Sequence, residues 1–422
     1  MDKLVIHGGR PLRGEIVIGG SKNAVLPMMA AAMLAEGRYA LSNVPRLKDV
    51  RTMARLVEGI GVSVTAEGRN LILENPGCRT WEAPYDLVKT MRASIYVLGP
   101  LLARYGRAKV SLPGGCAWGP RPVNLHIEGM RKLGADVAIK EGYIVATAGK
   151  LKGARILFDK SSVGATANIL LAAVLARGTT RIENAAREPE IDALCDFLNR
   201  MGGRIAGMGT GHLEIEGVDS LRPVSAEVIP DRIETGTYLV AGHITGGDLT
   251  LRRTRPDHCV AVIEKLRESG ADVDEGPDWI RVRSGGQIRP THVVTVEYPG
   301  FPTDMQAQWL ALMSLAAGTS TVTDTIFHDR FTHVAELQRL GADLTIDRNV
   351  CVVQGTDFLS GARVMSTDLR ASASLVLAGL VARGRTDISR VYHLDRGYER
   401  IEEKLGSVGA DIRRESEKTT PS

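Results

Sequence analysis

Two kinds of apolar pattern recur along the chain, and each predicts a helix. The segments 167–176, 308–317 and 372–382 are apolar or small at nearly every position, and a helix that lacks a polar face is buried. In the segment 398–405, by contrast, Ile401 and Leu405 lie at helical spacing among charged residues. This second pattern predicts an amphipathic helix.

A glycine marks the end of one helix in each of six similar stretches. The glycines are Gly61, Gly134, Gly202, Gly270, Gly341 and Gly409. An apolar residue stands three positions after each of them, and successive glycines are 68 to 73 residues apart. Glycine at such a place takes the left-handed conformation that ends a helix. A period of about 70 residues exceeds that of ordinary solenoids, so we expect six small α/β modules around an axis.

The six modules predict an α/β protein with three modules in each of two domains. At 422 residues the chain is too long for one ordinary core. We place the break at the proline-containing stretch 228–232. The first domain then covers 21–229. The second covers 230–422 together with the strand-like segment 1–20, which we expect to pair with the second half.

Composition and charge argue against nucleic-acid-binding, secreted and membrane-spanning classes of protein. The 53 basic and 49 acidic residues are scattered, so the net charge of +4 gives no basic stripe for nucleic acid. The N-terminal residues lack the apolar core of a signal peptide, and no uninterrupted apolar segment has the ~20 residues of a membrane span. The five cysteines show no paired spacing, as in a reducing compartment. We therefore expect a soluble, cytoplasmic protein.

The segment 112–122 is predicted to be a surface loop that carries a reactive cysteine. Its eleven residues include three glycines and three prolines, which exclude a helix or a central strand. Cys116 follows two glycines, and the charge of nearby Arg121 favours its thiolate. Taken alone, Cys116 is more readily explained as an incidental loop cysteine.

Six cations stand beside Gly, Asn or Pro, or at predicted helix starts. They are Lys22, Arg92, Arg121, Arg330, Arg370 and Arg396. Arginine forks and helix N-termini bind phosphate and carboxylate, so we expect an anionic ligand held between the domains. Asp304 follows two prolines near the start of a buried helix. It is expected to cap that helix, whatever else it does, and its functional interpretation is a general base whose orientation is fixed by the helix start.

Several cofactor motifs are missing from the sequence. Lys22 does not stand in a Walker phosphate loop, and no GxGxxG motif opens a helix. The nine histidines lack zinc-ligand spacing, so His328 and His333 are interpreted as structural. We expect no metal and no cofactor.

Ten motifs, taken in order, resemble a known family over essentially the whole chain. The motifs are the segments 19–24, 89–94, 112–117, 121–123, 162–166, 184–190, 230–236, 301–308, 368–374 and 395–400. They are similar to those of the enolpyruvyl transferases, and specifically of the family of UDP-N-acetylglucosamine 1-carboxyvinyltransferases. The resemblance implies an inside-out α/β barrel type of fold, with buried helices and outward-facing sheets in three units per domain.

The same resemblance implies a reaction. The enolpyruvyl group of phosphoenolpyruvate is transferred to the 3-hydroxyl of UDP-N-acetylglucosamine, and phosphate leaves after a tetrahedral addition intermediate. This is the first committed step of peptidoglycan precursor synthesis, and so of cell-wall growth, cell shape and cell division.

By position, the resemblance also assigns site residues. Phosphoenolpyruvate is expected to contact Lys22 and Asn23, with Arg121, Arg370 and Arg396 on its phosphate and carboxylate. The UDP-sugar is expected to contact Arg92, Arg121, Pro122, Val123, Asn124, Leu125, Lys160, Ser161, Ser162, Val163, Asp304, Ile326 and Arg330. Cys116 is implied to be the acid that protonates the methylene carbon or forms an adduct with phosphoenolpyruvate, and Asp304 the base. Family members with cysteine at this place are alkylated by fosfomycin, so we expect sensitivity here.

Three alternatives stay open at this point. A shikimate-type enolpyruvyl transferase shares the architecture but has no counterpart to the Gly-Gly-Cys loop. A paralogue could use another nucleotide sugar. A catalytically silent UDP-sugar-binding regulator is disfavoured because Cys116, Asp304 and Arg396 are all present.

Overall fold

The chain divides into two compact units, one of which is built from two separate stretches. In the computed structural model, which describes residues 2–89, 91–112 and 123–416, Gly20–Ile229 forms one unit, here called the continuous unit. Met1–Gly19 and Pro230–Ser422 together form the other, here called the split unit.

Six four-stranded sheets occur in the described residues, three in each unit, and all share one topology. An edge strand pairs in parallel with its neighbour, and the next two pairings are antiparallel. In the continuous unit the sheets are β14(Ser225–Glu227)-β3(Gly37–Ser42)-β5(Asn70–Asn75)-β4(Ser63–Glu67), β6(Glu82–Ala83)-β7(Arg107–Ser111)-β9(Tyr143–Thr147)-β8(Asp136–Lys140) and β10(Arg155–Leu157)-β11(Thr179–Glu183)-β13(His212–Glu216)-β12(Arg204–Ala206). In the split unit they are β16(Asp272–Glu275)-β17(Trp279–Arg283)-β15(Asp248–Arg252)-β2(Arg13–Val17), β18(Val293–Thr295)-β19(Thr319–Asp324)-β21(Val350–Gln354)-β20(Asp343–Asp347) and β22(Arg363–Met365)-β23(Arg385–Ser389)-β1(Asp2–His7)-β24(Asp411–Ser416). The six modules predicted from the glycine repeat are confirmed.

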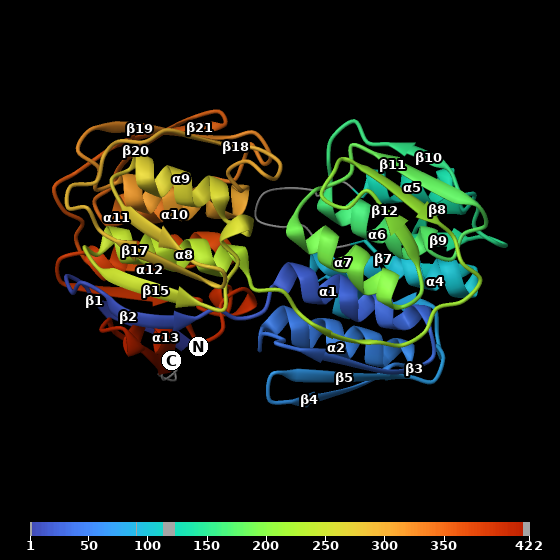
Figure 1. The fold of residues 1–422 in the computed structure, drawn as a ribbon. Coiled ribbons are helices and arrows are strands. Elements are labelled where there is room, and N and C mark those ends of the chain that lie inside the picture. The colour runs from blue at the N-terminus through green and yellow to red at the C-terminus, as the bar shows by residue number, and fades with distance from the viewer. Residues whose placement is uncertain (1, 90, 113–122, 417–422) are drawn as a thin grey trace. The chain divides into compact units, whose positions relative to one another are not determined.

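Three mostly apolar helices fill the inside of each unit, with strands around them (Figure 1). They are α1(Lys22–Ala31), α4(Leu98–Tyr105) and α6(Val163–Ala173) in the continuous unit, and α8(Arg232–Ile244), α10(Gln306–Met313) and α12(Leu369–Val381) in the split unit. In α8 every residue after Arg232 is buried. The predicted and observed ends of these helices differ by a few residues. Helices α6 and α12 follow the capping residues Ser162 and Asp368, which the apolar pattern does not identify.

Amphipathic helices complete the modules. They are α2(Lys48–Ile60), α5(Asn124–Lys132), α7(Pro189–Arg200), α9(Val260–Glu268), α11(Val334–Arg339) and α13(Ile401–Ser407). Shorter turns of helix are η1(Ala32–Leu34), α3(Tyr85–Val88), η2(Arg92–Val97), η3(Pro256–His258), η4(Thr303–Met305) and η5(Leu394–Arg396). All six repeat glycines have positive φ, between 91° and 129°, which confirms their predicted place at the ends of these helices.

Strands from distant parts of the chain close the sheets of each unit. In the continuous unit β14 pairs with β3, so that Ala226 lies opposite Leu41. In the split unit β2 pairs with β15, and β1 lies between β23 and β24. The first strands of the chain are therefore part of the split unit's core.

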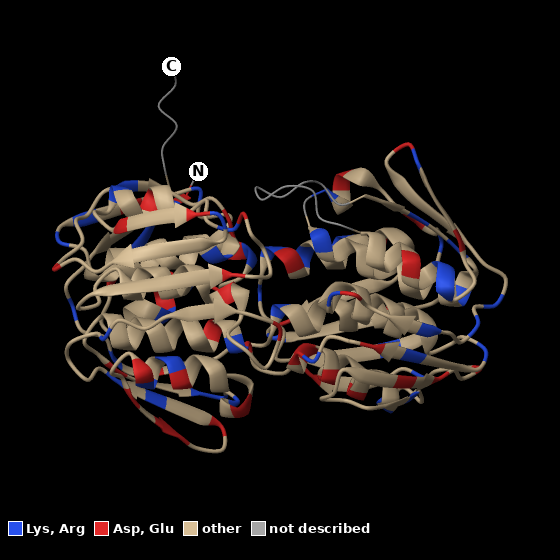
Figure 2. Ribbon diagram, turned by 90° about the horizontal axis from the view of Figure 1, so that it is seen from above, with Lys and Arg blue, Asp and Glu red and all other residues tan. Residues whose placement is uncertain are grey.

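The outer faces of the sheets carry charged side chains in cross-strand pairs. Arg181 and Glu214 are 2.8 Å apart across β11 and β13, and Arg281 and Asp248 are 2.7 Å apart across β17 and β15. Figure 2 shows charged residues on the strands and loops, while the inner helices are mostly uncharged. Exposed pairs of this kind contribute at most about 1 kcal/mol each, so the buried helices and inner sheet faces hold each unit together.

Candidate functional site

In the split unit, Asp304 lies between two buried arginines. Its Oδ1 is 2.9 Å from Nη2 of Arg330, and its Oδ2 accepts a hydrogen bond from Nε of Arg370 at 3.2 Å. Arg330 is 6% exposed and Arg370 2% exposed. Because these charges are shielded from solvent, their interaction is stronger than that of a surface ion pair.

The start of helix α12 places Arg370. Asp368 caps this helix, since its Oδ1 accepts from the backbone N–H groups of Arg370 and Ala371. Burial raises the pKa of Asp368, against the opposing effects of Arg330 and the two backbone donors. Asp304 belongs to η4, directly before α10, and Met305 stands at the N-cap position of α10. The cap role and the base role of Asp304 both stay predictions.

Arg370 has hydrogen-bonding capacity left over. Its Nη1 and Nη2 are buried and have no hydrogen-bond partner among the described residues. The Tyr398 ring centroid lies 5.5 Å from its guanidinium carbon. The amide of Gln306, the first residue of α10, likewise has neither atom paired within the described parts of the chain. Buried groups of this kind are costly unless something else binds them, so the arrangement is suited to a polar, anionic ligand.

Asp324, which was not among the predicted site residues, organises the loop that follows β19. It is fully buried, and its Oδ1 accepts from the backbone N–H groups of Ile326 and Phe327, both at 2.9 Å, and from Thr295 Oγ1 at 2.8 Å. The predicted site residue Ile326 is therefore held by this carboxylate. An acidic residue at the end of a strand rich in β-branched residues, Thr319–Asp324, is the sequence signal that could have identified it.

The other carboxylate oxygen of Asp324 is connected to Asp304 through Thr303 and Arg330. Its Oδ2 accepts from Thr303 Oγ1 at 2.7 Å, and Thr303 Oγ1 in turn accepts from Arg330 Nη1 at 2.9 Å. Arg330 then contacts Asp304 through its other nitrogen. A continuous chain of contacts thus joins the loop at Ile326 to Asp304 and Arg370.

Arg396 lies on a neighbouring element of the same unit. It is half-buried in η5, which packs against α12. A Cβ atom at the next residue, Gly397, would lie 2.0 Å from the side chain of Leu369, so a larger residue there would force Leu369 to move. The packing brings the segment of Arg396 beside the start of α12, where Arg370 stands.

In the continuous unit, Lys22 is the first residue of α1 and is 9% exposed. Its Nζ lies 3.7 Å from Oδ2 of Asp49, a buried residue in the first turn of α2. Asn23 follows in a half-buried position. A buried cation at a helix start is a place where phosphate or carboxylate binds well.

The remaining predicted residues of the continuous unit cluster at other helix starts. Arg92 begins η2, Asn124 begins α5 and Val163 begins α6, and both η2 and α5 pack against α6. Ser162 caps α6 by accepting from Ala165 N at 3.3 Å. Val123, Leu125 and Ser161 are half-buried, whereas Asn124 and Lys160 are exposed.

Three predicted residues, Cys116, Arg121 and Pro122, lie outside the described residues, as does most of the loop 112–122. The four cysteines that are described are free thiols: Cys78, Cys195, Cys259 and Cys351. Within the described parts of the chain, no group of His, Cys, Asp or Glu has the arrangement of a metal site. No described helix is long and apolar enough to cross a membrane.

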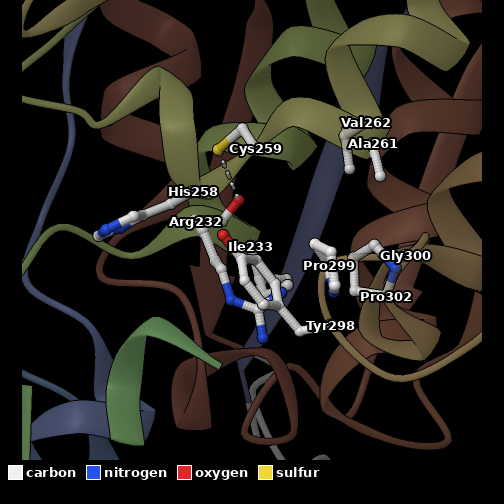
Figure 3. A pocket seen from close by; sticks show the side chains of 10 residues that line it. All are labelled: Arg232, Ile233, His258, Cys259, Ala261, Val262, Tyr298, Pro299, Gly300 and Pro302. Carbon is white, nitrogen blue, oxygen red and sulfur yellow. Dashed lines mark hydrogen bonds between the residues drawn. The ribbon is translucent and has the colours of Figure 1, made fainter. Parts of the chain in front are cut away.

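A small pocket of the split unit lies beside the start of α8 (Figure 3). Its lining consists of Arg232, Ile233, His258, Cys259, Ala261, Val262, Tyr298, Pro299, Gly300 and Pro302. Cys259 Sγ donates to the carbonyl oxygen of Arg232 at 3.8 Å. None of the predicted site residues lines this pocket, although Pro302 stands two positions before Asp304.

Comparisons with known proteins identify the family of the chain. A family model described as EPSP synthase (3-phosphoshikimate 1-carboxyvinyltransferase) matches residues 6–405. A UDP-N-acetylglucosamine 1-carboxyvinyltransferase of Halorhodospira halophila is 54% identical over 415 residues, which cover 98% of this chain and 99% of the relative. That of Myxococcus xanthus is also 54% identical, over 418 residues, covering 98% and 100%.

A solved structure supports the fold class. The enolpyruvyl transferase NikO of Streptomyces tendae superimposes with a TM-score of 0.88 at 27% identity, covering 98% of each chain. The buried-helix, outward-sheet architecture expected from the sequence is therefore confirmed. The chain belongs to the enolpyruvyl transferase family, in the branch of the UDP-N-acetylglucosamine 1-carboxyvinyltransferases.

Proposed function

We propose that this protein transfers the enolpyruvyl group of phosphoenolpyruvate to the 3-hydroxyl of UDP-N-acetylglucosamine and releases phosphate, as the first committed step of peptidoglycan precursor synthesis in the cytoplasm. The observation that carries the proposal is Asp304, held by Arg330 and Arg370 at the start of two buried helices. The unpaired Nη atoms of Arg370 support binding of an anion there. The names of relatives at 54% identity support the choice of acceptor.

Charge neutralisation is the main task of the cations. Phosphoenolpyruvate carries a phosphate and a carboxylate, and charge on both must be balanced through addition and elimination. Lys22 and Asn23 contact this substrate in the proposal, and Arg121, Arg370 and Arg396 bind its anionic groups. Arg92, residues 121–125, residues 160–163, Ile326 and Arg330 bind the nucleotide sugar.

Two protons must move during the addition. Cys116 gives one to the methylene carbon of phosphoenolpyruvate, or reacts covalently with it, while Asp304 accepts one from the sugar hydroxyl. An ion-paired carboxylate is a weaker proton acceptor than a free one. We therefore infer that bound phosphoenolpyruvate draws Arg370 away from Asp304 Oδ2, so that Asp304 becomes a more effective base when phosphoenolpyruvate is bound.

The shikimate-type alternative differs in the acceptor, which gives the first test. Phosphate release from phosphoenolpyruvate is measured with UDP-N-acetylglucosamine, with shikimate 3-phosphate and with no acceptor. We expect release only with the nucleotide sugar. Release with shikimate 3-phosphate would establish the alternative, and folded protein that releases no phosphate with any acceptor would favour the silent regulator.

Replacing Cys116 by Ser should abolish or strongly reduce turnover at neutral pH, because a hydroxyl is a far weaker acid and nucleophile than a thiol. The variant should also resist inactivation by fosfomycin, to which the wild-type enzyme should be sensitive. Cys78→Ser is the matched control, since Cys78 is a half-buried free thiol of the same unit. Full activity of Cys116→Ser would exclude the acid role.

Replacing Asp304 by Asn should lower kcat by about a hundredfold or more, because an amide cannot accept the hydroxyl proton. UDP-N-acetylglucosamine binding, measured by calorimetry, should change much less. Asp343→Asn, at an exposed carboxylate of the same unit, serves as the control and should keep wild-type kcat. A kcat near that of wild type in Asp304→Asn would show that another group is the base.

Replacing Asp324 by Asn should lower kcat/KM by roughly ten- to a hundredfold, as expected for one lost buried hydrogen bond to a charged acceptor. The amide nitrogen cannot accept from Thr303, so the contact chain to Arg330 and Asp304 loosens. KM for the nucleotide sugar should rise while KM for phosphoenolpyruvate changes little, because Asp324 also holds the Ile326 loop. An equal loss of kcat/KM with both substrates, or no loss with either, would count against this positioning role. Asp347→Asn on exposed β20 is the control.

A further inference from the structure

Tyr398 places one hydroxyl group between the three inner helices of the split unit. It is 1% exposed. Its hydroxyl oxygen lies 2.8 Å from Oγ1 of Thr237 in α8 and accepts a hydrogen bond from Nε2 of Gln308 in α10 at 3.2 Å. The centroid of its ring lies 5.5 Å from the guanidinium carbon of Arg370 in α12. A single buried side chain thus lies against α8, α10 and α12.

The directions of these hydrogen bonds follow from the partners of Thr237. Its Oγ1 donates its hydrogen to the carbonyl oxygen of Ile233 at 2.8 Å. Oγ1 therefore accepts from the hydroxyl of Tyr398, and that hydroxyl keeps a lone pair for Gln308. Burial raises the pKa of Tyr398, against the opposing charge of Arg370. The phenol is thus protonated at neutral pH and is able to donate.

Gln308 connects this hydroxyl to Asp304. Nε2 of Gln308 donates to the backbone carbonyl oxygen of Asp304 at 3.0 Å. A carbonyl only accepts, so the nitrogen and oxygen of the amide cannot be exchanged. The second hydrogen of Nε2 is shared by Oγ1 of Thr237, 3.1 Å away, and the hydroxyl of Tyr398. The backbone at Asp304 is therefore held through Gln308 by these two hydroxyls.

Tyr398 also belongs to the segment that carries Arg396. Its backbone N–H donates to the carbonyl oxygen of Leu394 at 3.0 Å, which closes the turn of η5 around Arg396. Gly397, between Arg396 and Tyr398, packs closely against Leu369 at the start of α12. Because Tyr398 is anchored to α8 and α10, this whole segment is fixed beside the start of α12.

The orientation of Arg370 depends on the groups connected in this way. Its Nε donates to Asp304, and the ring of Tyr398 is close enough for a cation–π interaction. Its Nη1 and Nη2 are buried and have no hydrogen-bond partner in the described parts of the chain. Two contacts thus fix the guanidinium group and leave its remaining donors for a ligand.

We propose that Tyr398 is a positioning residue for phosphoenolpyruvate: its hydroxyl, held by Thr237 and Gln308, keeps the guanidinium group of Arg370 in the orientation that receives this anion. This inference rests on the proposed function, because it takes phosphoenolpyruvate as the ligand of Arg370. The competing explanation is that the hydroxyl only stabilises the fold.

Steady-state phosphate release gives KM for each substrate separately. In Tyr398→Phe, which keeps the ring and removes the hydroxyl, we expect KM for phosphoenolpyruvate to rise by about three- to tenfold, as for one lost neutral hydrogen bond. KM for UDP-N-acetylglucosamine should stay at the wild-type value. Removal of a hydroxyl that only stabilises the fold would lower the melting temperature or the amount of active enzyme and leave both KM values unchanged.

A second variant tests the same hydrogen bond from its other end. Thr237→Val keeps the branched shape and removes the acceptor of the Tyr398 hydroxyl, so KM for phosphoenolpyruvate should rise by a similar factor. The double variant should show no larger rise than the stronger single variant, because both substitutions break one interaction.

Tyr238→Phe is the matched control. Tyr238 is a completely buried tyrosine of α8 whose hydroxyl has no hydrogen-bond partner among the described residues. Its removal should leave both KM values at the wild-type level. Thermal unfolding checks that each variant is folded.

Four results would overturn the proposal. They are a wild-type KM for phosphoenolpyruvate in folded Tyr398→Phe, an equal rise in KM for both substrates, the same rise in Tyr238→Phe, and rises that multiply in the double variant. If Tyr398→Phe does not fold, the KM values of Thr237→Val decide in the same way. If wild-type protein releases no phosphate with UDP-N-acetylglucosamine, the proposed function itself fails, and the two failures are thereby distinguished.

Discussion

The complete burial of the inner helices is the constraint on which the rest of the structure depends. A buried helix still leaves the N–H groups of its first turn without partners inside the helix. In three of these helices a side chain accepts hydrogen bonds from N–H groups of the first turn: Asp231 caps α8, Asp368 caps α12 and Ser162 caps α6. Helices α1, α4 and α10 have no side-chain cap. Two of these three, α1 and α10, begin at Lys22 and beside Asp304, so in each unit an uncapped helix start lies at a predicted site residue.

The buried charges of the predicted site residues have partners of opposite charge within each unit. Lys22 is near Asp49, and Asp304 is shared by Arg330 and Arg370. Removing such charges from water is tolerable only with a partner at hand. An anionic substrate can replace a protein carboxylate as that partner, which makes binding an exchange of one buried ion pair for another.

The sequence predicted the repeat more completely than the site. The six glycines and the apolar helices follow from local conformation and periodicity, which neighbouring residues determine. The cations could be located as residues at helix starts. The pairing of Asp304 with Arg370, 66 positions later, and the contact of Tyr398 with Thr237, 161 positions earlier, depend on how modules pack. For the same reason the role of Asp324 was missed, since its partners come from three separate segments.

The split unit consists of two separate stretches of chain, so its strands are synthesised at widely separated times. All strands of the continuous unit, including the closing β14, have been synthesised by the time residue 229 leaves the ribosome, so this unit is able to fold at once. Strands β1 and β2 are synthesised first, yet their partners β15, β23 and β24 come more than two hundred residues later. During that interval the first strands have unpaired edges, which are prone to aggregate. Charged residues of both signs lie along this segment, namely Asp2, Lys3, Arg10, Arg13 and Glu15. Charged side chains on unpaired strands oppose edge-to-edge association, so they protect the segment until its partner strands are synthesised.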